Sequence, residues 1–395
     1  MAGLAAPAHP PPQIFPVPPG QQLLRGEPGE TLDSAAFLAY ETFGELNALR
    51  DNAILFVTCY GERTSDASVT AMVEPSADGD PPRFDTSRYF VVVVNMLGNG
   101  LSFSPTTPGA WPRCGITYFD NAQAQRLLLT SLGVDKLALI YGFSMGAMIA
   151  LQWAVQFPQD VAAVVAVCGT AKTGAANTYF LEQLQRALRD DPEAKLAEVP
   201  GGRDAVVLNF GGNPNPQGLT TYADIYSDWV FDGPTPTAGG KSPDAGRPDF
   251  ARAREGACCF RDGLYKEKFG VESESAFAEV WRDDFRGWDA VSHWAVSSTW
   301  LHGDVSANLG DTFGGDLSKA LGSIDAKVVM LPGSTDQYFL AEEAAAQAAM
   351  IPRGECVVLP SPMGHVAERM ADMQGRINAA IAACLAVSGV EEPRM

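Results

Sequence analysis

Short runs of apolar residues recur along the chain and alternate with segments of helical character. The runs predict strands at 37–43, 54–59, 89–95, 137–141, 161–168, 328–332 and 356–359. Apolar positions spaced three and four residues apart predict helices between several of these runs, at 121–132, 147–157, 341–350 and 370–385. Strands that alternate with helices form βαβ units, so we expect an α/β fold with a mostly parallel central sheet and helices on both faces.

The alternation stops between residues 171 and 324. This segment begins with a helical pattern at 179–188 and continues through a stretch rich in glycine and proline. It then carries four tryptophans, which either pack within the segment or line an acyl pocket: Trp281, Trp288, Trp294 and Trp300. An insertion of this size between two strands predicts a mostly helical lid over 171–324.

The start of the chain differs in composition from the rest. Prolines recur from Pro7 to Pro19, and this favours an extended, disordered arm over residues 1–30. The α/β core is therefore expected to comprise two stretches, 31–170 and 325–390.

Charge and cysteine content narrow the classes of partner and compartment. The 395 residues include 28 Lys and Arg against 47 Asp and Glu, a formal net charge of −19, which repels phosphate backbones and anionic lipid headgroups. We therefore expect neither nucleic acid nor a membrane as a partner. The uncharged stretch 137–159 divides into a strand-like half and an amphipathic half, so it predicts a buried strand–turn–helix rather than a membrane span. The N-terminus lacks the pattern of a signal peptide and the seven cysteines form no CxxC pair, so we expect free thiols and a cytoplasmic location.

A G-x-S-x-G pattern, Gly142-Phe-Ser144-Met-Gly146, lies between a predicted strand and a predicted helix. At a nucleophile elbow the serine occupies a strained turn, and glycines two residues away on either side avoid collisions with the neighbouring strand and helix. The same turn directs the backbone N–H of Met145 toward the reacting centre, where it supplies half of an oxyanion hole. We therefore predict Ser144 as a nucleophile.

A serine nucleophile needs a base and an acid, which follow it in the order acid then histidine in such folds. Of the four histidines, His9 lies in the arm and His293 and His302 lie in the predicted lid. His365 follows the last predicted strand and Asp336 follows the one before it, both at carboxyl ends of strands, where open α/β sheets place their sites. Ser144, Asp336 and His365 are thus the predicted triad, with Asp304 and Asp311 as weaker alternatives for the acid.

The second oxyanion donor should come from the loop after the strand at 54–59. There the backbone N–H of Cys59 or Tyr60 would point at the same oxygen as that of Met145. Cys59 could also be a reactive thiol, but no histidine lies near it in sequence, which favours a structural role. The chain contains no HExxH motif, phosphate-binding loop or cluster of metal ligands, so no cofactor and no metal are expected.

Several longer motifs in register resemble those of the α/β-hydrolase superfamily, specifically its homoserine O-acetyltransferase-like branch. The matching segments extend from about residue 36 to residue 381 and include Asn95-Met-Leu-Gly-Asn-Gly-Leu-Ser102, Asp120-Asn-Ala-Gln-Ala-Gln125, Gly142-Phe-Ser-Met-Gly-Ala147, Gln152-Trp-Ala154, Gly169-Thr-Ala-Lys-Thr173, Gly315-Asp-Leu317 and Ser361-Pro-Met-Gly-His365. The resemblance implies an α/β-hydrolase fold with a helical lid, an active Ser–His–Asp triad and a homodimer formed through the lid helices.

The sequence departs from homoserine acetyltransferases at positions that bear on the substrate. Those enzymes usually have glycines where this chain has Phe143 and Ala147, an aspartate where it has Val366, and an arginine where it has Gln185, next to Arg186. Losing a cation and an acid removes the groups expected to bind a zwitterionic amino acid. The chain therefore looks closer to the esterase members of the branch, which hydrolyse short-chain esters.

Three functions remain open at this point. The first is a serine carboxylic ester hydrolase acting on small acetyl-type esters through an acyl-serine intermediate. The second is an O-acyltransferase that moves an acetyl group from acetyl-CoA to homoserine or a related hydroxyl compound. The third, a catalytically inactive hydrolase fold used for binding, is disfavoured because serine, aspartate and histidine are all present.

Overall fold

The structure, a computed structural model, describes residues 11–64, 66–75, 82–197, 207–231 and 274–390. Outside these residues lie His9, the pair Cys258–Cys259 and most of the segment rich in glycine and proline.

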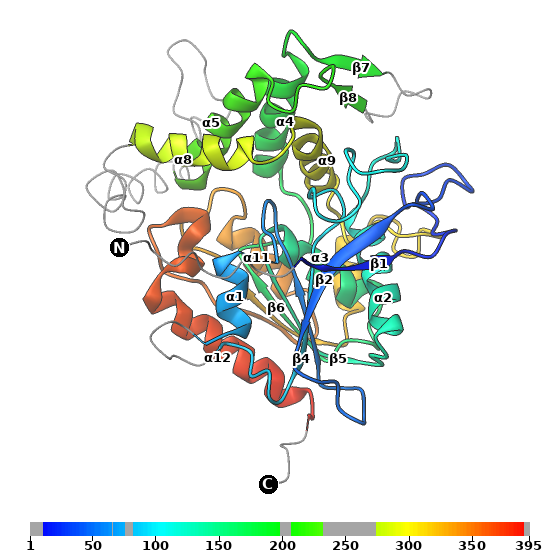
Figure 1. The fold of residues 1–395 in the computed structure, drawn as a ribbon. Coiled ribbons are helices and arrows are strands. Elements are labelled where there is room, and N and C mark those ends of the chain that lie inside the picture. The colour runs from blue at the N-terminus through cyan, green and yellow to red at the C-terminus, as the bar shows by residue number, and fades with distance from the viewer. Residues whose placement is uncertain (1–10, 65, 76–81, 198–206, 232–273, 391–395) are drawn as a thin grey trace, which may run out of the picture.

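One eight-stranded sheet runs through the centre of the molecule (Figure 1). Its strands are β1 (Gln13–Pro16), β2 (Phe37–Phe43), β3 (Ala53–Val57), β4 (Phe90–Val94), β5 (Leu137–Phe143), β6 (Ala163–Val167), β9 (Lys327–Leu331) and β10 (Gly354–Cys356). The spatial order is β1-β2-β4-β3-β5-β6-β9-β10, with β1 and β2 antiparallel to their neighbours and all other pairs parallel. The predicted mostly parallel α/β sheet is confirmed.

Successive residues of the central strands face two different hydrophobic cores, because side chains alternate along a strand. Leu55, Val92 and Ile140 point into the larger core, while their neighbours Phe56 and Val93 point into the smaller one. Both faces are buried, so the strands consist of continuous apolar runs, and this explains why the sequence located them.

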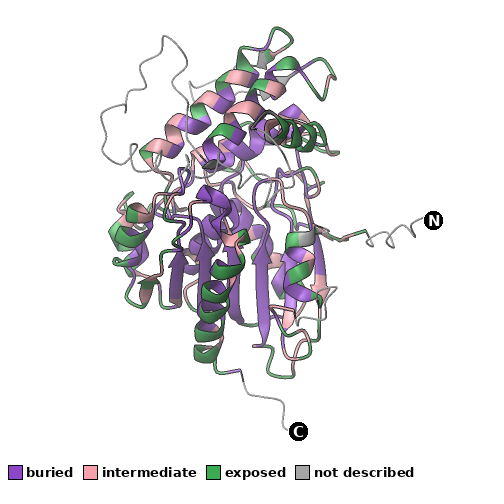
Figure 2. Ribbon diagram, turned by 90° about the vertical axis from the view of Figure 1, so that its left-hand side faces the viewer, coloured by how far each residue is buried: buried purple, intermediate pink, exposed green. Residues whose placement is uncertain are grey.

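Helices cover both faces of the sheet, as predicted (Figures 1 and 2). The larger core packs against α2 (Tyr118–Ser131), α3 (Met145–Gln156), α10 (Leu317–Gly322) and α11 (Ala341–Ala348); the smaller packs against α1 (Ala67–Val73) and α12 (Ala371–Val387). In Figure 2 the buried positions fill the sheet and the inner sides of these helices, and the exposed positions lie on their outer sides. None of the described helices combines the length and apolar character needed to cross a bilayer.

Two expectations about the ends of the sheet need correction. Residues 13–16, within the stretch expected to be a disordered arm, form β1 and pair with β2, and Val17 and Leu23 beyond them are buried. β1 is an edge strand, where a proline such as Pro16 is tolerated because one side of the strand needs no hydrogen bonds. The last strand spans 354–356 rather than 356–359, because its pairing with β9 is set by Gly354 opposite Val328.

The segment between β6 and β9 contains a separate group of helices. They are α4 (Ala175–Arg189), α5 (Gln217–Phe231), α8 (Glu274–Arg286) and α9 (Ala290–Leu301), with a small hairpin of β7 (Lys195–Ala197) and β8 (Val207–Asn209). We call the four helices the cap, because they form a layer beyond one end of the sheet (Figure 1). The mostly helical character expected of 171–324 agrees with the described residues in that range; its action as a lid stays a proposal.

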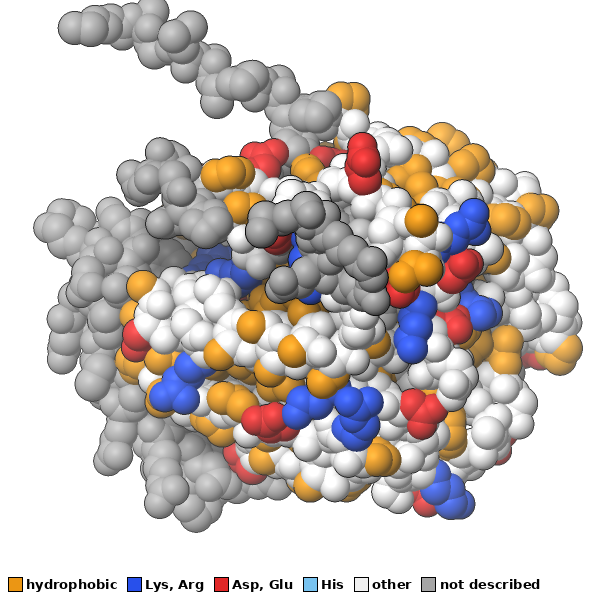
Figure 3. Space-filling view, turned by 90° about the horizontal axis from the view of Figure 1, so that it is seen from below, with side chains coloured by type: hydrophobic (Ala, Val, Ile, Leu, Met, Phe, Trp, Pro, Cys, Tyr) orange, Lys and Arg blue, Asp and Glu red, His pale blue; other side chains and the backbone are white. Residues whose placement is uncertain are grey.

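The net negative charge is not gathered on the face seen from below in Figure 3. In the part of that face that the structure describes, acidic and basic side chains lie next to one another among polar and apolar ones. This arrangement is typical of an ordinary solvated surface.

Candidate active site

The turn between β5 and α3 has the geometry of a nucleophile elbow. Ser144 has φ 56° and ψ −122°, a conformation that residues other than glycine rarely adopt. A Cβ atom on Gly142 would lie 2.2 Å from the Gly146 carbonyl, and one on Gly146 would lie 2.4 Å from the Val57 carbonyl. The two glycines are therefore required sterically, as the sequence predicts.

A third glycine, which sequence reasoning did not assign to the elbow, completes this packing. Gly169 follows β6, and a Cβ there would approach the Ala147 Cβ to 2.5 Å and the Ser144 carbonyl to 2.8 Å. The available signal was a glycine directly after the apolar run at 161–168. That run contains β6, which pairs with the strand that leads to the nucleophile.

The structure brings the three predicted triad residues together. Ser144 donates its hydroxyl hydrogen to His365 Nε2 over 2.9 Å, and His365 Nδ1 donates to Asp336 Oδ2 over 2.8 Å. The direction follows from chemistry: a carboxylate only accepts, so Nδ1 carries the proton and Nε2 is left as the acceptor. All three residues are buried, with exposed fractions of 1%, 4% and 2% for serine, histidine and aspartate.

Backbone groups fix the orientation of the acid. The second carboxylate oxygen of Asp336 accepts hydrogen bonds from the N–H groups of Tyr338 at 2.8 Å and Phe339 at 3.1 Å. The two alternative acids are placed elsewhere: Asp304 forms an ion pair with Lys172 at 2.7 Å, and Asp311 is exposed in a turn. Geometry therefore selects Asp336.

Two hydroxyl side chains join the loop of the acid to the loop of the histidine, and sequence reasoning missed both. Ser334 and Thr335 each donate a hydrogen bond to the Ser361 carbonyl, at 3.1 and 2.8 Å. The N–H of Gly364 in turn donates to the Thr335 hydroxyl at 3.0 Å. These bonds couple two loops that follow different strands, so that the imidazole and the carboxylate are held in register.

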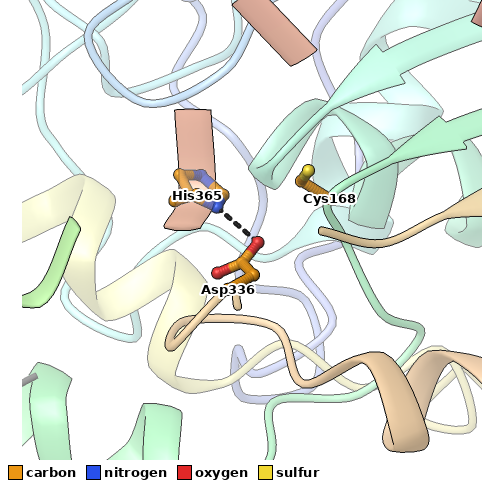
Figure 4. Close-up of side chains that lie close together, drawn as sticks. All are labelled: Cys168, Asp336 and His365. Carbon is orange, nitrogen blue, oxygen red and sulfur yellow. Dashed lines mark hydrogen bonds and ion pairs between the residues drawn. The ribbon is translucent and has the colours of Figure 1, made fainter. Parts of the chain in front are cut away.

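Cys168 lies beside the acid and the base (Figure 4). Its Sγ, a carboxylate oxygen of Asp336 and a ring nitrogen of His365 fall within 4.8 Å of one another. Burial, and then the charge of Asp336, raise the pKa of the Cys168 thiol well above its usual value. A protonated thiol at this place leaves the carboxylate free to bind the imidazole.

The loop after β3 lies beside the elbow because β3 and β5 pair in parallel, with Val57 opposite Gly142. The N–H of Cys59 donates to the Glu62 carboxylate at 3.1 Å, so it is already engaged. In the described part of the chain no acceptor takes the N–H of Tyr60 or of Met145. Between the two loop residues named from sequence, Tyr60 is therefore the better candidate for an oxyanion donor.

Cys59 itself has the surroundings of a structural thiol. Burial raises its pKa well above the usual value, and the neighbouring Glu62 carboxylate adds to the effect. A thiolate is the reactive form, so these surroundings disfavour the reading of Cys59 as a nucleophile.

A cavity of about 660 Å³ opens onto Ser144 and His365. This volume lies within the usual range for small-molecule sites, roughly 300–1,000 Å³. Its cap side is aromatic, formed by Tyr226, Trp281 and Phe285. Trp281 thus lines the cavity, whereas the other three tryptophans of the insertion, Trp288, Trp294 and Trp300, are buried in the cap.

Charged side chains line the cavity, but not at the positions where the sequence differs from homoserine acetyltransferases. Val366 lies in its wall, and neither Gln185 nor Arg186 is among the described residues that line it. Other charged residues do line it: Arg83, Glu62, Asp66, Asp284, Glu368 and Arg369. Burial raises the pKa of the carboxyls of Glu62, Asp284 and Glu368. The cavity therefore combines an apolar wall with groups able to bind a polar portion of a substrate.

Comparison with known proteins agrees with this architecture. A family model described as the alpha/beta hydrolase fold matches residues 52–201. An ethyl acetate hydrolase of Pseudomonas veronii is 32% identical over 335 residues, which cover 83% of this chain and 83% of that protein. A homoserine O-acetyltransferase of Geotalea uraniireducens is 34% identical over 208 residues, 48% of this chain and 55% of that protein.

Among solved structures, an acetyl esterase superposes with a TM-score of 0.75 at 29% identity, covering 96% of this chain and 97% of that one. The resemblance drawn from sequence motifs is thereby confirmed. The chain is an enzyme of the α/β-hydrolase family, within the group that holds both esterases and homoserine O-acetyltransferases.

Proposed function

We propose that this protein is a serine carboxylic ester hydrolase that acts on short-chain acyl esters through an acyl-serine intermediate. The observation that carries the proposal is the hydrogen-bonded chain from Ser144 through His365 to Asp336, which opens onto one cavity. The ethyl acetate hydrolase, similar over most of the chain, supports an acetyl-type substrate.

In the proposed reaction, His365 Nε2 accepts the proton of Ser144 as Oγ attacks the ester carbonyl carbon. The carbonyl π electrons move onto oxygen and give a tetrahedral intermediate. When that intermediate collapses, the bond to the alkoxy oxygen breaks and the imidazolium returns the proton to the departing alcohol. Water then attacks the acyl-serine with the same base, and the acid and free Ser144 are released.

Two further groups stabilise the charges that form. The Asp336 carboxylate supports the imidazolium and keeps the proton on Nδ1, so that Nε2 always faces the serine. The N–H groups of Met145 and Tyr60 are the proposed donors to the oxyanion, each typically worth about 3–4 kcal/mol of transition-state stabilisation. The cap, acting as the proposed lid, encloses the ester with its aromatic wall.

Acyl transfer to a hydroxyl acceptor is the second candidate, and the charged lining of the cavity favours it. The two reactions share the acyl-serine and differ in whether water or an acceptor hydroxyl attacks it. Arg369 and Glu368 pair with each other over 3.2 Å in the lining of the cavity, and this pair is the proposed site for the charged ends of an amino acid acceptor such as homoserine, in place of the groups missing at residues 185 and 366. The homoserine O-acetyltransferase relative supports this alternative.

Two assays on the purified protein separate the candidates. We expect release of p-nitrophenol from p-nitrophenyl acetate, and little release of CoA from acetyl-CoA with homoserine. Strong acceptor-dependent CoA release with negligible hydrolysis would reverse the order of the two candidates. Ser144→Ala should lower either activity by roughly 10⁴-fold or more. Unchanged turnover in that variant would refute the nucleophile, and no turnover by the wild type would favour the inactive binding protein.

Location and assembly are proposed on separate grounds. The five described cysteines are free thiols, four of them buried, which suits the reducing environment of the cytoplasm. A homodimer through the cap helices follows from the resemblance to the family. Light scattering on the purified protein tests it, since a mass of one chain at working concentration would exclude the dimer.

A further inference from the structure

The side chain of Tyr60 is tied to two helices of the cap. Its hydroxyl lies 2.7 Å from that of Tyr222 on α5 and 2.7 Å from Nδ1 of His293 on α9. His293 Nε2 lies 3.2 Å from the carbonyl of Phe285, the penultimate residue of α8. Tyr60, Tyr222 and His293 are buried, at 8%, 0% and 1% exposed. One residue of the loop after β3 is therefore bound to three cap helices through a single chain of hydrogen bonds.

The direction of every bond in this chain is determined. The Phe285 carbonyl only accepts, so His293 Nε2 carries the proton and Nδ1 of the neutral ring accepts. The Tyr60 hydroxyl must then donate to Nδ1. Its 2.7 Å contact with the Tyr222 hydroxyl therefore takes the single hydrogen of Tyr222, in preference to the longer contact of that hydroxyl with the His293 carbonyl at 3.4 Å. The ring of His293 is neutral because burial lowers its pKa to about 4.

The backbone around Tyr60 is held on one side and permissive on the other, so the side-chain bonds contribute to its position. Before it, the Cys59 N–H is held by the Glu62 carboxylate at 3.1 Å. After it, Gly61 has φ 77°, the flexible left-handed conformation. The Tyr60 N–H itself has no acceptor within the described part of the chain. Its orientation is therefore set by two features: the turn that the Glu62 N–H closes on the Cys59 carbonyl at 3.2 Å, and the side chain, which is bound to the cap.

We propose that Tyr222 and His293 are positioning residues for the oxyanion hole: through the Tyr60 hydroxyl they hold the Tyr60 N–H in place while the cap is docked. The inference rests on the proposed function, because it assigns the Tyr60 N–H to the oxyanion. It makes the cap a part of the catalytic apparatus as well as a wall of the cavity. We call the hydrogen-bonded chain of Tyr60, Tyr222 and His293 the tether. A displacement of about 1 Å at such a donor can lower the rate by about 100-fold, so small changes in the tether become measurable.

Packing allows the hydroxyl to be removed without removing the ring. The Tyr60 ring stacks on that of Trp288, with centroids 5.9 Å apart and planes at 10°, and on His293 at 5.7 Å. Phenylalanine at position 60 keeps both stacks and loses only the two hydrogen bonds. Tyr222→Phe breaks the chain one step farther away and also removes the 3.4 Å contact of that hydroxyl with the His293 carbonyl; Tyr222 is not among the described residues that line the cavity.

The test compares Tyr60→Phe and Tyr222→Phe with a matched control, Tyr118→Phe. Tyr118 is likewise buried, and its hydroxyl donates to Met148 Sδ at 3.1 Å, so the control loses a buried hydroxyl outside the tether. We expect kcat/KM for p-nitrophenyl acetate to fall about 10- to 100-fold in the first two variants and by less than about twofold in the control. KM should change little, since the tether acts on the transition state.

A pair of inhibitors distinguishes positioning from a general structural effect. A trifluoromethyl ketone adds to Ser144 and forms an oxyanion, whereas the corresponding methyl ketone binds as a neutral carbonyl. In both tether variants the affinity for the trifluoromethyl ketone should fall by the same factor as kcat/KM, and that for the methyl ketone should stay unchanged.

Three outcomes overturn the inference or the function beneath it. The positioning role would be refuted if both tether variants fold and keep the kcat/KM and the trifluoromethyl ketone affinity of the wild type. An equal loss of affinity for the two ketones would refute it as well. If Tyr60→Phe does not fold, Tyr222→Phe decides by the same measurements. Failure of the proposed function would give a different result. Either the wild-type protein would not hydrolyse the ester, or the Ser144→Ala variant would hydrolyse it as fast as the wild type.

Discussion

Two regions of the molecule each bury one histidine with both ring nitrogens bonded, yet only one of these two histidines is bonded to a carboxylate. At the carboxyl edge of the sheet, His365 lies between Asp336 and Ser144, at 2.8 and 2.9 Å. In the cap, His293 lies between Tyr60 and the Phe285 carbonyl, at 2.7 and 3.2 Å. The two rings are similarly enclosed, with 4% and 1% exposed.

The difference lies in the group that faces Nδ1. A proton gained by His365 on Nε2 would be balanced by the Asp336 carboxylate already bonded to Nδ1. A proton gained by His293 would face only a phenol and a carbonyl, and burial accordingly lowers its pKa to about 4. Burial among neutral groups disfavours the charged ring, whereas a carboxylate bonded to Nδ1 balances the charge that the ring gains when Nε2 accepts a proton. The cap histidine is thus suited to hold a neighbour, and the sheet-edge histidine to move a proton.

Replacing each histidine by glutamine is the strongest test of this contrast. We expect His365→Gln to lower kcat/KM for p-nitrophenyl acetate by roughly 10⁴-fold or more, because no other group can accept the serine proton. His293→Gln should lower it by only about tenfold, because it weakens the position of one donor. Circular dichroism confirms that both variants fold. Losses of equal size would show that the two rings do not differ in role.

The next largest effect is expected for Asp336→Asn. The amide leaves the size of the side chain unchanged but can donate to Nδ1, which favours the tautomer with its proton on Nε2, the wrong one for a base. The expected loss in kcat is roughly 10³- to 10⁴-fold with nearly unchanged KM. Asp304→Asn is the matched control, since that carboxylate pairs with Lys172. A larger loss in the control than in Asp336→Asn would reassign the acid.

The region around His365 could be predicted from sequence because its determinants are local. Gly142, Ser144 and Gly146 fall within five residues, and the acid and the base follow apolar runs that fix where each strand ends. Chain order and the small number of histidines then selected His365. Parallel strands bring such loops together at one edge, so the motif, the chain order and the strand positions together predicted that these three side chains meet.

The region around His293 could not be predicted in this way. Tyr60 is 162 residues from Tyr222 and 233 from His293 in sequence, and no periodic pattern links the three. His293 was assigned to the insertion, but its partner was not foreseen. The bond of Glu62 to the Cys59 N–H, which separates Cys59 from Tyr60 as an oxyanion donor, was also not foreseen, although it is local and joins residues only three positions apart. Contacts between distant segments depend on packing angles that local sequence does not encode.

A steric change at the elbow should have an intermediate effect, on stability as well as activity. Gly146→Ala places a Cβ atom about 2.4 Å from the Val57 carbonyl, closer than real contacts allow, so α3 or β3 must shift. We expect a loss of roughly 1–3 kcal/mol in the free energy of unfolding, measured in urea, and a fall in kcat. Gly375→Ala on α12 is the control, since a Cβ atom there meets nothing within 4 Å. Equal stability of the two variants would contradict the packing described for the elbow.

The smallest effect concerns stability against pH, and it tests the neutrality of the cap histidine. His293 has a pKa of about 4 in the folded protein and an ordinary value of 6.5. Between these values the unfolded chain binds the proton and the folded one does not. The neutral ring thus contributes stability that is fully present above pH 6.5 and is lost as pH falls toward 4. From about pH 7.5 to about pH 5, this term should lower the free energy of unfolding by about 2 kcal/mol.

His293→Gln lacks the term, whereas its carboxylates titrate as in the wild type, so the difference between the two urea-unfolding curves isolates the ring. The charged group that acts on it, Asp289, remains in both proteins. A difference in free energy that does not change over this pH range would mean that the ring binds its proton equally well folded and unfolded. His293 would then no longer be an obligate acceptor for Tyr60.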